Sequence, residues 1–365
     1  MGMESNIGSN KAVYTTDVPE DRIKLVEMIT RLEKPVVMFI GDVDSGKTTA
    51  LTFVANELIN LGYRVGIVDS DLGQKGILPP ATVSLGIVEE NFPSLSAVEP
   101  YMHYFIGITT PAQYIGETVV GVKRLVDVAR SMADVVLIDT TGFVTGPGFD
   151  LKRLKIEAVR PDLVVFIQST GEREHSIEEL MAVSSPLAEA VLLKRSERVR
   201  PYSHEERRAI RAAKWRTYFS GSSPVLVDLS TLRVSGTSMF SGRSLTAEER
   251  EIFERLHDWV VLAGWKDKEV YTIVKADSSR RPYNRFVIKA IDFEMLSNLL
   301  VGFIDELGFC LGLGILKWPR LSEGLLEVLT PLGPEELSRA VEVRFGRIRV
   351  TEMGEELALL RRDDL

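Results

Sequence analysis

Apolar positions in the first 240 residues recur with two spacings, which predict short buried strands separated by amphipathic helices. Residues 36–40 form a continuous apolar run of strand length, and residues 48–61 follow with a helical spacing that Gly62 ends. Another helical pattern covers residues 20–32. Strands that alternate with helices are typical of an α/β protein with a mostly parallel, doubly wound sheet. Further strands are predicted at residues 64–68, 103–108, 135–138, 163–167, 190–193 and 224–229, and a further helix ends near Met132.

The C-terminal part of the chain has a different pattern. Alternating apolar positions at residues 286–291 and 340–350 predict strands there. We therefore expect three parts: a short N-terminal extension over residues 1–35, an α/β domain over residues 36–240, and a smaller β-rich domain over residues 241–365. A chain of 365 residues, 45% of them hydrophobic, is long enough for one large core and a second, smaller one.

The segment GDVDSGKTT joins the first predicted strand to the helix after it, and its spacing fits the phosphate-loop pattern G-x-x-x-x-G-K-[ST]. Such a loop binds a nucleotide because its backbone N–H groups and the positive end of the helix surround a phosphate. Lys47 is placed to reach the β- and γ-phosphate oxygens, and the hydroxyl of Thr48 to hold Mg²⁺. A chance match in a glycine-rich turn is the alternative, but the flanking strand and helix favour a nucleotide site. The predicted nucleotide-binding residues are Gly41, Asp42, Val43, Asp44, Ser45, Gly46, Lys47, Thr48 and Thr49.

Three aspartates follow predicted strands at the edge of the sheet where α/β proteins bind ligands. Asp69 and Asp71 come after the strand at residues 64–68, and Asp139 has the Walker B position after another strand. Asp71 lies one strand–helix unit beyond Lys47, within reach of the γ-phosphate region. The alternative for Asp69 and Asp71 is that they only begin a turn and cap a helix. We predict a nucleoside triphosphate site in which Thr48, Asp69 and Asp139 hold the metal ion.

Composition narrows the class of protein. No apolar run approaches the roughly 18 to 20 residues of a membrane span, and the N-terminus lacks a signal sequence, so we expect a cytoplasmic protein without a membrane partner. The single cysteine, Cys310, excludes an internal disulfide bond, and the four histidines lack the spacing of a zinc site. Any metal ion is therefore expected to be Mg²⁺. A net charge of −8 argues against a surface covered with nucleic acid, and the scarcity of glutamine fits a heat-adapted composition.

One segment opposes this acidic average: residues 194–216 hold nine lysines and arginines against three glutamates, a local charge of +6. As a helix, the segment would place Arg207, Arg211, Trp215 and Tyr218 on one face. Arginines next to aromatic rings suit phosphates and stacked bases. The alternative is a solvated basic face whose aromatic residues anchor the helix in the core. We expect that role for the aromatic residues and a functional one for the arginines, because phosphoryl transfer needs positive charge over the γ-phosphate.

Together these segments resemble those of the polynucleotide 5′-hydroxyl kinases, which include the kinase subunit of eukaryotic mRNA 3′-end cleavage and the ribosomal-RNA-processing kinases. GDVDSGKTT looks like the family's phosphate loop, DSDLGQ like its catalytic carboxylate segment, and DTTGF like its Walker B region. Thr109, Pro111 and Gln113 resemble its clasp on the transferred phosphate, and RRAIRAAKWRTYF resembles its arginine lid, here at about residues 195–220. LLVGF, CLGLGI and VRFGR look like its C-terminal β domain. Because only a short extension precedes the phosphate loop, we expect a short form without the N-terminal β-sandwich domain of the eukaryotic members.

The resemblance implies an enzyme that transfers the γ-phosphoryl group of ATP to the 5′-hydroxyl end of RNA or DNA, with Mg²⁺. It implies that Lys47 neutralises the β and γ oxygens and that Asp71 orients and deprotonates the 5′-hydroxyl. Thr109 and Gln113 would hold the migrating phosphoryl group. Proteins of RNA processing or repair are expected as further partners.

The lid arginines are not aligned uniquely by the resemblance. Arg208 and Arg211 are the expected catalytic residues, and the choice among these two and Arg207 stays open. Arg211 is the one expected to contact the transferring phosphoryl group, because it lies centrally on the predicted face.

Two other functions compete with this one. A GTPase or metallochaperone would share the phosphate loop and the aspartates, and residues 274–277 faintly resemble a guanine-reading Lys-x-Asp motif at Lys275 and Asp277. The motif comes after the basic segment, whereas guanine readers end a late strand of the same sheet, so its position argues against this function. The second competitor is a scaffold that binds ATP without catalysis. We favour an enzyme, because Lys47, Asp71 and the arginine cluster are all present.

Overall fold

The computed structural model describes residues 19–169, 172–196, 201–276 and 282–365. Its chain divides into two compact units, one formed by Met1–Tyr104 with Thr110–Arg208 and the other by Phe105–Thr109 with Ala209–Leu365. The expected domain boundary after residue 240 stays a prediction, because a compact unit need not be a folding domain. Within the described ranges, no helix combines the length and the apolar surface needed to cross a membrane.

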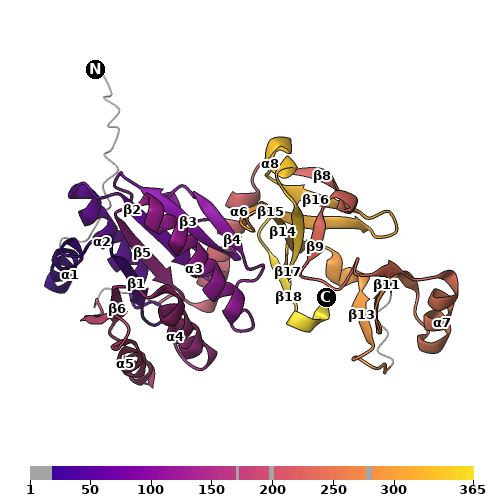
Figure 1. Ribbon diagram of the computed structural model, residues 1–365, viewed down its shortest axis with the longest axis horizontal. Helices are drawn as coiled ribbons and strands as arrows, with labels where there is room; N and C mark the ends of the chain where they lie inside the picture. Colours follow the sequence, from indigo (N-terminus) through magenta and orange to yellow (C-terminus); the bar gives the residue numbers. More distant parts are fainter. Residues whose placement is uncertain (1–18, 170–171, 197–200, 277–281) are drawn as a thin grey trace, which may run out of the picture. The chain divides into compact units, whose positions relative to one another are not determined.

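The first unit is built on a mostly parallel sheet with strand order β4-β3-β2-β5-β1-β6-β7 (Figure 1). β1 lies between β5 and β6 and is parallel to both, with Val37 opposite Leu137 on one side and Leu163 on the other. β2 pairs with β5 and β7 with β6, again in parallel. The predicted mostly parallel α/β fold is therefore confirmed. The strands are β1 (Val36–Ile40), β2 (Val65–Ser70), β3 (Thr82–Val88), β4 (Met102–Phe105), β5 (Val135–Thr140), β6 (Leu163–Ile167) and β7 (Glu189–Leu193).

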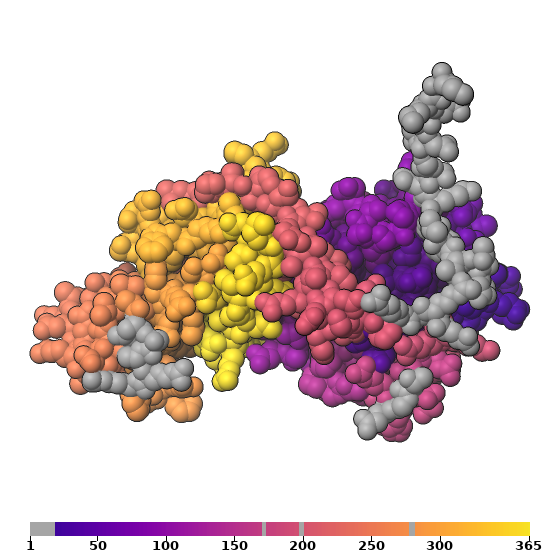
Figure 2. All heavy atoms as spheres, turned by 180° about the vertical axis from the view of Figure 1, so that it is seen from behind, coloured from indigo at the N-terminus to yellow at the C-terminus, as the bar shows by residue number. Residues whose placement is uncertain are grey.

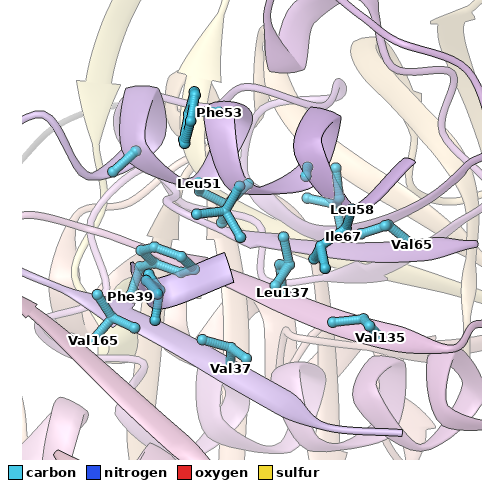
Figure 3. Packing of buried hydrophobic residues seen from close by; sticks show 14 of the residues in the cluster. Val37, Phe39, Leu51, Phe53, Leu58, Val65, Ile67, Val135, Leu137 and Val165 are labelled. Carbon is cyan, nitrogen blue, oxygen red and sulfur yellow. The ribbon is translucent and has the colours of Figure 1, made fainter. Parts of the chain in front are cut away.

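One face of this sheet is covered by helices α1 and α2, and buried apolar side chains fill the space between (Figure 3). Alternate residues of each strand point to this side, among them Val37 and Phe39 of β1, which pack toward Leu51 of α2. The other helices of the unit contact one another, α3 with α4 and α4 with α5. This packing fixes the strand, loop and helix that carry the phosphate loop. The helices are α1 (Glu20–Thr30), α2 (Lys47–Asn60), α3 (Ile115–Met132), α4 (Pro147–Val159) and α5 (Glu172–Ser184), with a short 3-10 turn η1 (Leu95–Ala97).

The strands β3 and β8 depart from the predicted parallel sheet. β3 was not predicted, and it pairs antiparallel with β2, where it extends the sheet beyond its parallel part. The prediction that residues 224–229 continue the parallel sheet is wrong, because the corresponding strand β8 (Ser223–Asp228) pairs antiparallel with β16 (Leu325–Thr330) in the second unit. An apolar run indicates a strand, but it does not identify the partner of that strand.

The second unit contains a largely antiparallel sheet with the order β18-β17-β14-β15-β16-β8, in which β9 pairs in parallel with β17. The predicted strand at residues 340–350 is β17 of this sheet. The helix α6 (His204–Phe219) crosses the boundary between the units, and its residues from Ala209 onward belong here. The further elements are β9 (Arg233–Ser235), β14 (Leu299–Ile304), β15 (Cys310–Arg320), β17 (Glu342–Val350), β18 (Glu356–Leu359), α8 (Pro334–Ser338) and the turns η2 (Leu229–Thr231), η3 (Phe293–Leu296) and η4 (Arg362–Asp364).

A separate four-stranded sheet, β10-β11-β12-β13, also belongs to the second unit. Its strand β13 confirms the strand predicted at residues 286–291. A cluster of aromatic rings joins this sheet to α7. In this cluster His257 stacks on Trp259, with the ring centroids 4.4 Å apart. The elements are β10 (Arg243–Ser244), α7 (Ala247–His257), β11 (Val261–Asp267), β12 (Val270–Lys275) and β13 (Ile288–Asp292). The expected β-rich character of the C-terminal region is confirmed.

Candidate active site

The predicted phosphate loop connects β1 to α2, as the pattern requires. Gly46 has a left-handed backbone, with φ of 89°, directly before the first residue of α2. A side chain at Gly41 would meet the Ser45 hydroxyl oxygen at 2.8 Å and the Ile167 Cβ at 3.0 Å. The glycines therefore permit a tight turn that directs the N-terminus of α2 at the loop, which is the geometry of a phosphate site.

Lys47 is buried at the start of α2, with 6% of its surface exposed. Its Nζ donates a hydrogen bond to the main-chain oxygen of Asp42 at 2.7 Å, so the ammonium group lies inside the loop. Burial lowers the pKa of Lys47, while the carboxylates of Asp139 and Asp71 act in the opposite direction. The positive charge of Lys47 is partly balanced by these carboxylates, and the oxygens of a bound phosphate can balance it further.

Thr48 and Asp139 are in direct contact. The Thr48 hydroxyl donates to Oδ2 of Asp139 at 2.7 Å. Asp139 lies opposite Asp69 in the parallel pairing of β2 and β5, which brings the two carboxylates to one edge of the sheet. Burial, and then the charge of Asp69, raise the pKa of Asp139 to about 7. A hydroxyl and a carboxylate that are both oxygen ligands fit the needs of Mg²⁺.

Asp69 and Asp71 have different hydrogen-bond partners. The oxygens of Asp69 accept hydrogen bonds from the backbone N–H groups of Asp71, Gly76 and Ile77 at 3.0, 2.7 and 2.8 Å. Both oxygens thus accept hydrogen bonds from the chain, and the expected role of Asp69 as a metal ligand stays a prediction. Asp71 uses Oδ1 to accept from the N–H groups of Gly73 and Gln74 at 3.0 and 2.9 Å. Within the described part of the chain Oδ2 of Asp71 has no such partner, and it is the oxygen available to a substrate.

No three His, Cys, Asp or Glu side chains of the described residues converge in the manner of a complete metal site. Thr48 and Asp139 are the pair of oxygen ligands that a phosphate-bound Mg²⁺ would add to its phosphate ligands. Mg²⁺ is bound in this way in many phosphate-transfer sites, with a few protein ligands and the rest from phosphates and water.

Three buried lysines surround these carboxylates, and sequence reasoning missed them. Lys75 donates to the main-chain oxygen of Asp69 at 2.6 Å, and Lys155 donates to the hydroxyl of Ser70 at 2.8 Å. Lys152 donates to the main-chain oxygen of Thr141 at 2.6 Å. Each has at most 1% of its surface exposed. Lys152 and Lys155 could have been found from the sequence, because they lie three residues apart on the apolar face of α4.

Arginines from three segments line a cavity of about 570 Å³ beside the phosphate loop. Arg207 of α6 forms an ion pair with the side chain of Asp44, and Arg195 donates to the main-chain oxygen of Asp44 at 3.3 Å. Arg173 of α5 donates to both carboxylate oxygens of Asp42, at 2.7 and 2.8 Å. Arg207 and Arg195 belong to the predicted lid, but Arg173 was not predicted, because nothing in the pattern of α5 connects it with the loop.

The other lid arginines lie apart from these contacts. Arg208 is exposed, whereas Arg211 forms an ion pair with Glu356, its Nε being 3.0 Å from Oε1. Trp215 donates from Nε1 to the same carboxylate at 3.2 Å and is fully buried. In Figure 2 the C-terminal segment, in yellow, accordingly lies against the rose-coloured segment that includes the end of α6. The expected role of the aromatic residues as core anchors is confirmed, while Arg198 and Arg200 lie outside the described residues.

The predicted clasp residues are divided between the two units. Thr109 is half-buried and belongs to the second unit, whereas Gln113 is exposed and belongs to the first. Their contact with a phosphoryl group stays a prediction.

The Lys-x-Asp motif lies in the separate four-stranded sheet of the second unit. Lys275 is the last residue of β12, and its ammonium group pairs with Asp292. Asp277 lies outside the described residues. Guanine readers end a strand of the sheet that carries the phosphate loop, and the strand of Lys275 is not part of that sheet.

Comparison with known proteins identifies relatives of this chain. Residues 41–221 match the family described as mRNA cleavage and polyadenylation factor CLP1 P-loop. The polyribonucleotide 5′-hydroxyl-kinase of Thermococcus kodakarensis is 55% identical over 98% of this chain and 100% of its own length. That of Methanocaldococcus jannaschii is 44% identical over 98% of each chain. A chain of the solved wild-type Clp1p–Pcf11p complex has a TM-score of 0.58 at 13% identity, over 90% of this chain and 79% of that one, which shows a shared fold.

Proposed function

Because the chain belongs to the family of polyribonucleotide 5′-hydroxyl kinases with a CLP1-type phosphate loop, we propose that it is an ATP-dependent kinase of 5′-hydroxyl RNA ends. The observation that carries this function is one group of side chains at the carboxyl ends of β1, β2 and β5: the buried Lys47, Asp71 and Asp139, with the exposed Thr48 hydrogen-bonded to Asp139. Such a group offers a phosphate site, a metal site and a base within a single edge of the sheet.

The residues of the chain have separate tasks in the proposed reaction. Lys47 and the backbone N–H groups of the loop stabilise the negative charge on the β and γ oxygens of ATP. Asp71 orients the 5′-hydroxyl through Oδ2 and accepts its proton as the oxygen attacks phosphorus. Mg²⁺, when bound at Thr48 and Asp139, would supply a Lewis acid that neutralises charge on the phosphates. Asp69 holds the segment that carries Asp71, since it accepts the N–H of that residue.

The lid and the clasp complete the proposal. Arg207 and Arg195 are described lid arginines in contact with the phosphate loop, and Arg207 is proposed to add positive charge next to the transferring group. Arg208 and Arg211 keep their predicted place in the lid, although the pairing of Arg211 with Glu356 favours a structural role for it. Thr109 and Gln113 are proposed to hold the migrating phosphoryl group.

The finer points of the proposal come from the sequence. DNA ends are included as substrates, and proteins of RNA processing or repair as partners. A cytoplasmic location and an α/β domain that ends near residue 240, followed by a β-rich domain, belong to the proposal as well.

An end-labelling assay with γ-labelled ATP tests the function. Oligonucleotides of RNA and DNA with 5′-hydroxyl ends, and a free nucleoside, serve as acceptors, and the same RNA with a 5′-phosphate is the control. We expect label on the 5′-hydroxyl RNA and none on the control. Tight binding of ATP without transfer to any acceptor would support the non-catalytic scaffold instead.

A further inference from the structure

The side chain of Arg173 makes an unusual contact for an arginine on a helix surface. Its side chain is 54% exposed, whereas the side chain of its partner Asp42 is only 9% exposed. Only Nη1 of the guanidinium donates in this pair, to both oxygens of Asp42. Among the described residues Nη2 and Nε make no hydrogen bond, so most of the donor capacity of Arg173 is free for another acceptor.

Asp42 holds a second cation at the same time. Its main-chain oxygen accepts the hydrogen bond of Lys47 at 2.7 Å, while its carboxylate accepts those of Arg173. Lys47 is the cation that a phosphate loop presents to a nucleotide, and here it rests on the loop itself. Arg173 and Lys47 are thus held by one residue, on a loop whose backbone is shaped for phosphate.

A carboxylate and a phosphate are interchangeable partners for a guanidinium. Both present two oxygens to the planar fork of arginine, and a phosphate with its greater charge attracts the fork more strongly. Arg173 lies in the first turn of α5 and lines the cavity beside the loop together with Arg195 and Arg207. A short movement of an exposed side chain is enough to exchange Asp42 for a ligand in this cavity.

We infer that Arg173 is a further phosphate-binding residue of this site: Asp42 holds its guanidinium until a substrate phosphate competes for it. The inference rests on the proposed kinase function. The phosphate belongs either to ATP or to the first linkage of the polynucleotide, and both present the same chemistry to Arg173. The alternative is a structural pair, in which Arg173 only neutralises the charge of Asp42 so that the loop tolerates a nucleotide.

Isothermal titration of four proteins with ATP separates the two roles: wild type, Arg173→Ala, Asp42→Asn and the double variant. If Arg173 binds a phosphate of ATP, Arg173→Ala weakens ATP binding about tenfold or more, and the double variant stays as weak. Asp42→Asn alone should bind ATP more tightly than the double variant, because it keeps the arginine and removes the competitor for it. If Arg173 only neutralises Asp42, the second substitution restores binding in the double variant, and the inference is overturned.

A parallel titration with a 5′-hydroxyl RNA oligonucleotide identifies the source of the phosphate. Loss of RNA affinity with unchanged ATP affinity assigns Arg173 to the strand, and the reverse assigns it to the nucleotide. Wild-type affinity of Arg173→Ala for both ligands overturns the inference. Arg153→Ala is the matched control, since Arg153 pairs with Glu157 on the surface of α4 at 2.7 Å.

Melting temperatures of all variants show whether they fold, and Arg173→Gln replaces the alanine variant if that one does not. Wild-type protein that binds ATP but transfers nothing would contradict the proposed function and leave the titration result on Arg173 valid. Wild-type protein that binds neither ligand would overturn both.

Discussion

The two units bury charged side chains in different ways. Most buried charged side chains of the first unit lie at one edge of its sheet, where four carboxylates and four lysines surround the same loop segments. They are Asp42, Asp69, Asp71, Asp139, Lys47, Lys75, Lys152 and Lys155. In the second unit the buried cations lie apart from one another. Lys275 pairs with Asp292, and Arg347 donates to main-chain oxygens, including that of Gly236 at 2.6 Å.

The difference separates a functional use of buried charge from a structural one. An isolated buried cation is tolerated when its donors are satisfied, as those of Arg347 are by carbonyl oxygens. A cluster can shift the pKa of its members: burial raises the pKa of Asp139 to about 7 and lowers that of Lys155 to about 7. Clusters of perturbed groups at the carboxyl edge of an α/β sheet are where catalysis occurs. Changes to the cluster in the first unit should therefore affect turnover, and changes to the separate buried cations of the second should affect stability.

The largest expected effect on turnover comes from substituting two residues of the cluster. Lys47→Ala and Asp71→Asn should each lower turnover at least about 10³-fold, by different routes. The first removes charge that stabilises the transferring phosphoryl group, whereas the second keeps the shape and removes the basicity. Nucleotide binding should survive better in Asp71→Asn. Rates of transfer to a 5′-hydroxyl RNA and titration with ATP measure the two properties.

Lys275→Met in the second unit is the matched control. It removes a buried lysine that has its own carboxylate partner, so it should lower the melting temperature and leave turnover close to that of wild type. Near wild-type turnover in Asp71→Asn would show that the base is a different group.

The second effect compares two arginines of one helix that fall in different units. Arg207→Ala removes the partner of Asp44 in the phosphate loop and should lower turnover about 10²- to 10³-fold. Arg211→Ala removes the partner of Glu356 and should lower the melting temperature with little change in turnover. Glu356→Gln should reproduce the loss of stability. If Arg211→Ala instead loses turnover at an unchanged melting temperature, the expectation from the sequence was right and the pair with Glu356 is not its main role.

The sequence predicted the parts of the site that depend on short segments. The phosphate loop, the aspartates after β2 and β5, and most strands of the first sheet follow from local patterns, because a strand end and a glycine loop are encoded within ten residues or so. Contacts between distant segments that no motif links were not predicted. Arg173 and Asp42 are 131 residues apart, and Lys155 and Ser70 are 85 apart. Nothing in the residue spacing of α5, which carries Arg173, or of α4, which carries Lys155, indicates which loop each helix contacts in the folded protein.

A third effect concerns the pH dependence of stability. Burial lowers the pKa of Lys155 from its usual 10.5 to about 7, so between these values the unfolded chain binds more protons than the folded one. The folded state is therefore penalised most at and below pH 7, and the penalty disappears as the pH rises toward 10.5. Lys155→Met should raise the free energy of unfolding relative to wild type by more at pH 7 than at pH 10, as measured in urea.

The matched control for this pH effect is Lys123→Met. Lys123 is an exposed lysine of α3, paired with Asp127, and it should give the same difference from wild type at both pH values. An equal effect of Lys155→Met at pH 7 and pH 10 would mean that the lysine stays charged in the folded protein.

For the last substitution we expect no effect. It tests whether the second unit takes part in nucleotide selection. Asp277→Ala should leave the ratio of ATP to GTP turnover unchanged, and guanine nucleotides should not be preferred over adenine ones. The physical reason is the position of the neighbouring Lys275, which ends a strand of the separate sheet and pairs with Asp292. Steady-state rates with both nucleotides measure the ratio, and Asp267→Ala, in the neighbouring strand β11, is the control. A preference for GTP of tenfold or more that disappears in Asp277→Ala would move the protein to the GTPase class, because only direct contact with the base produces such a loss.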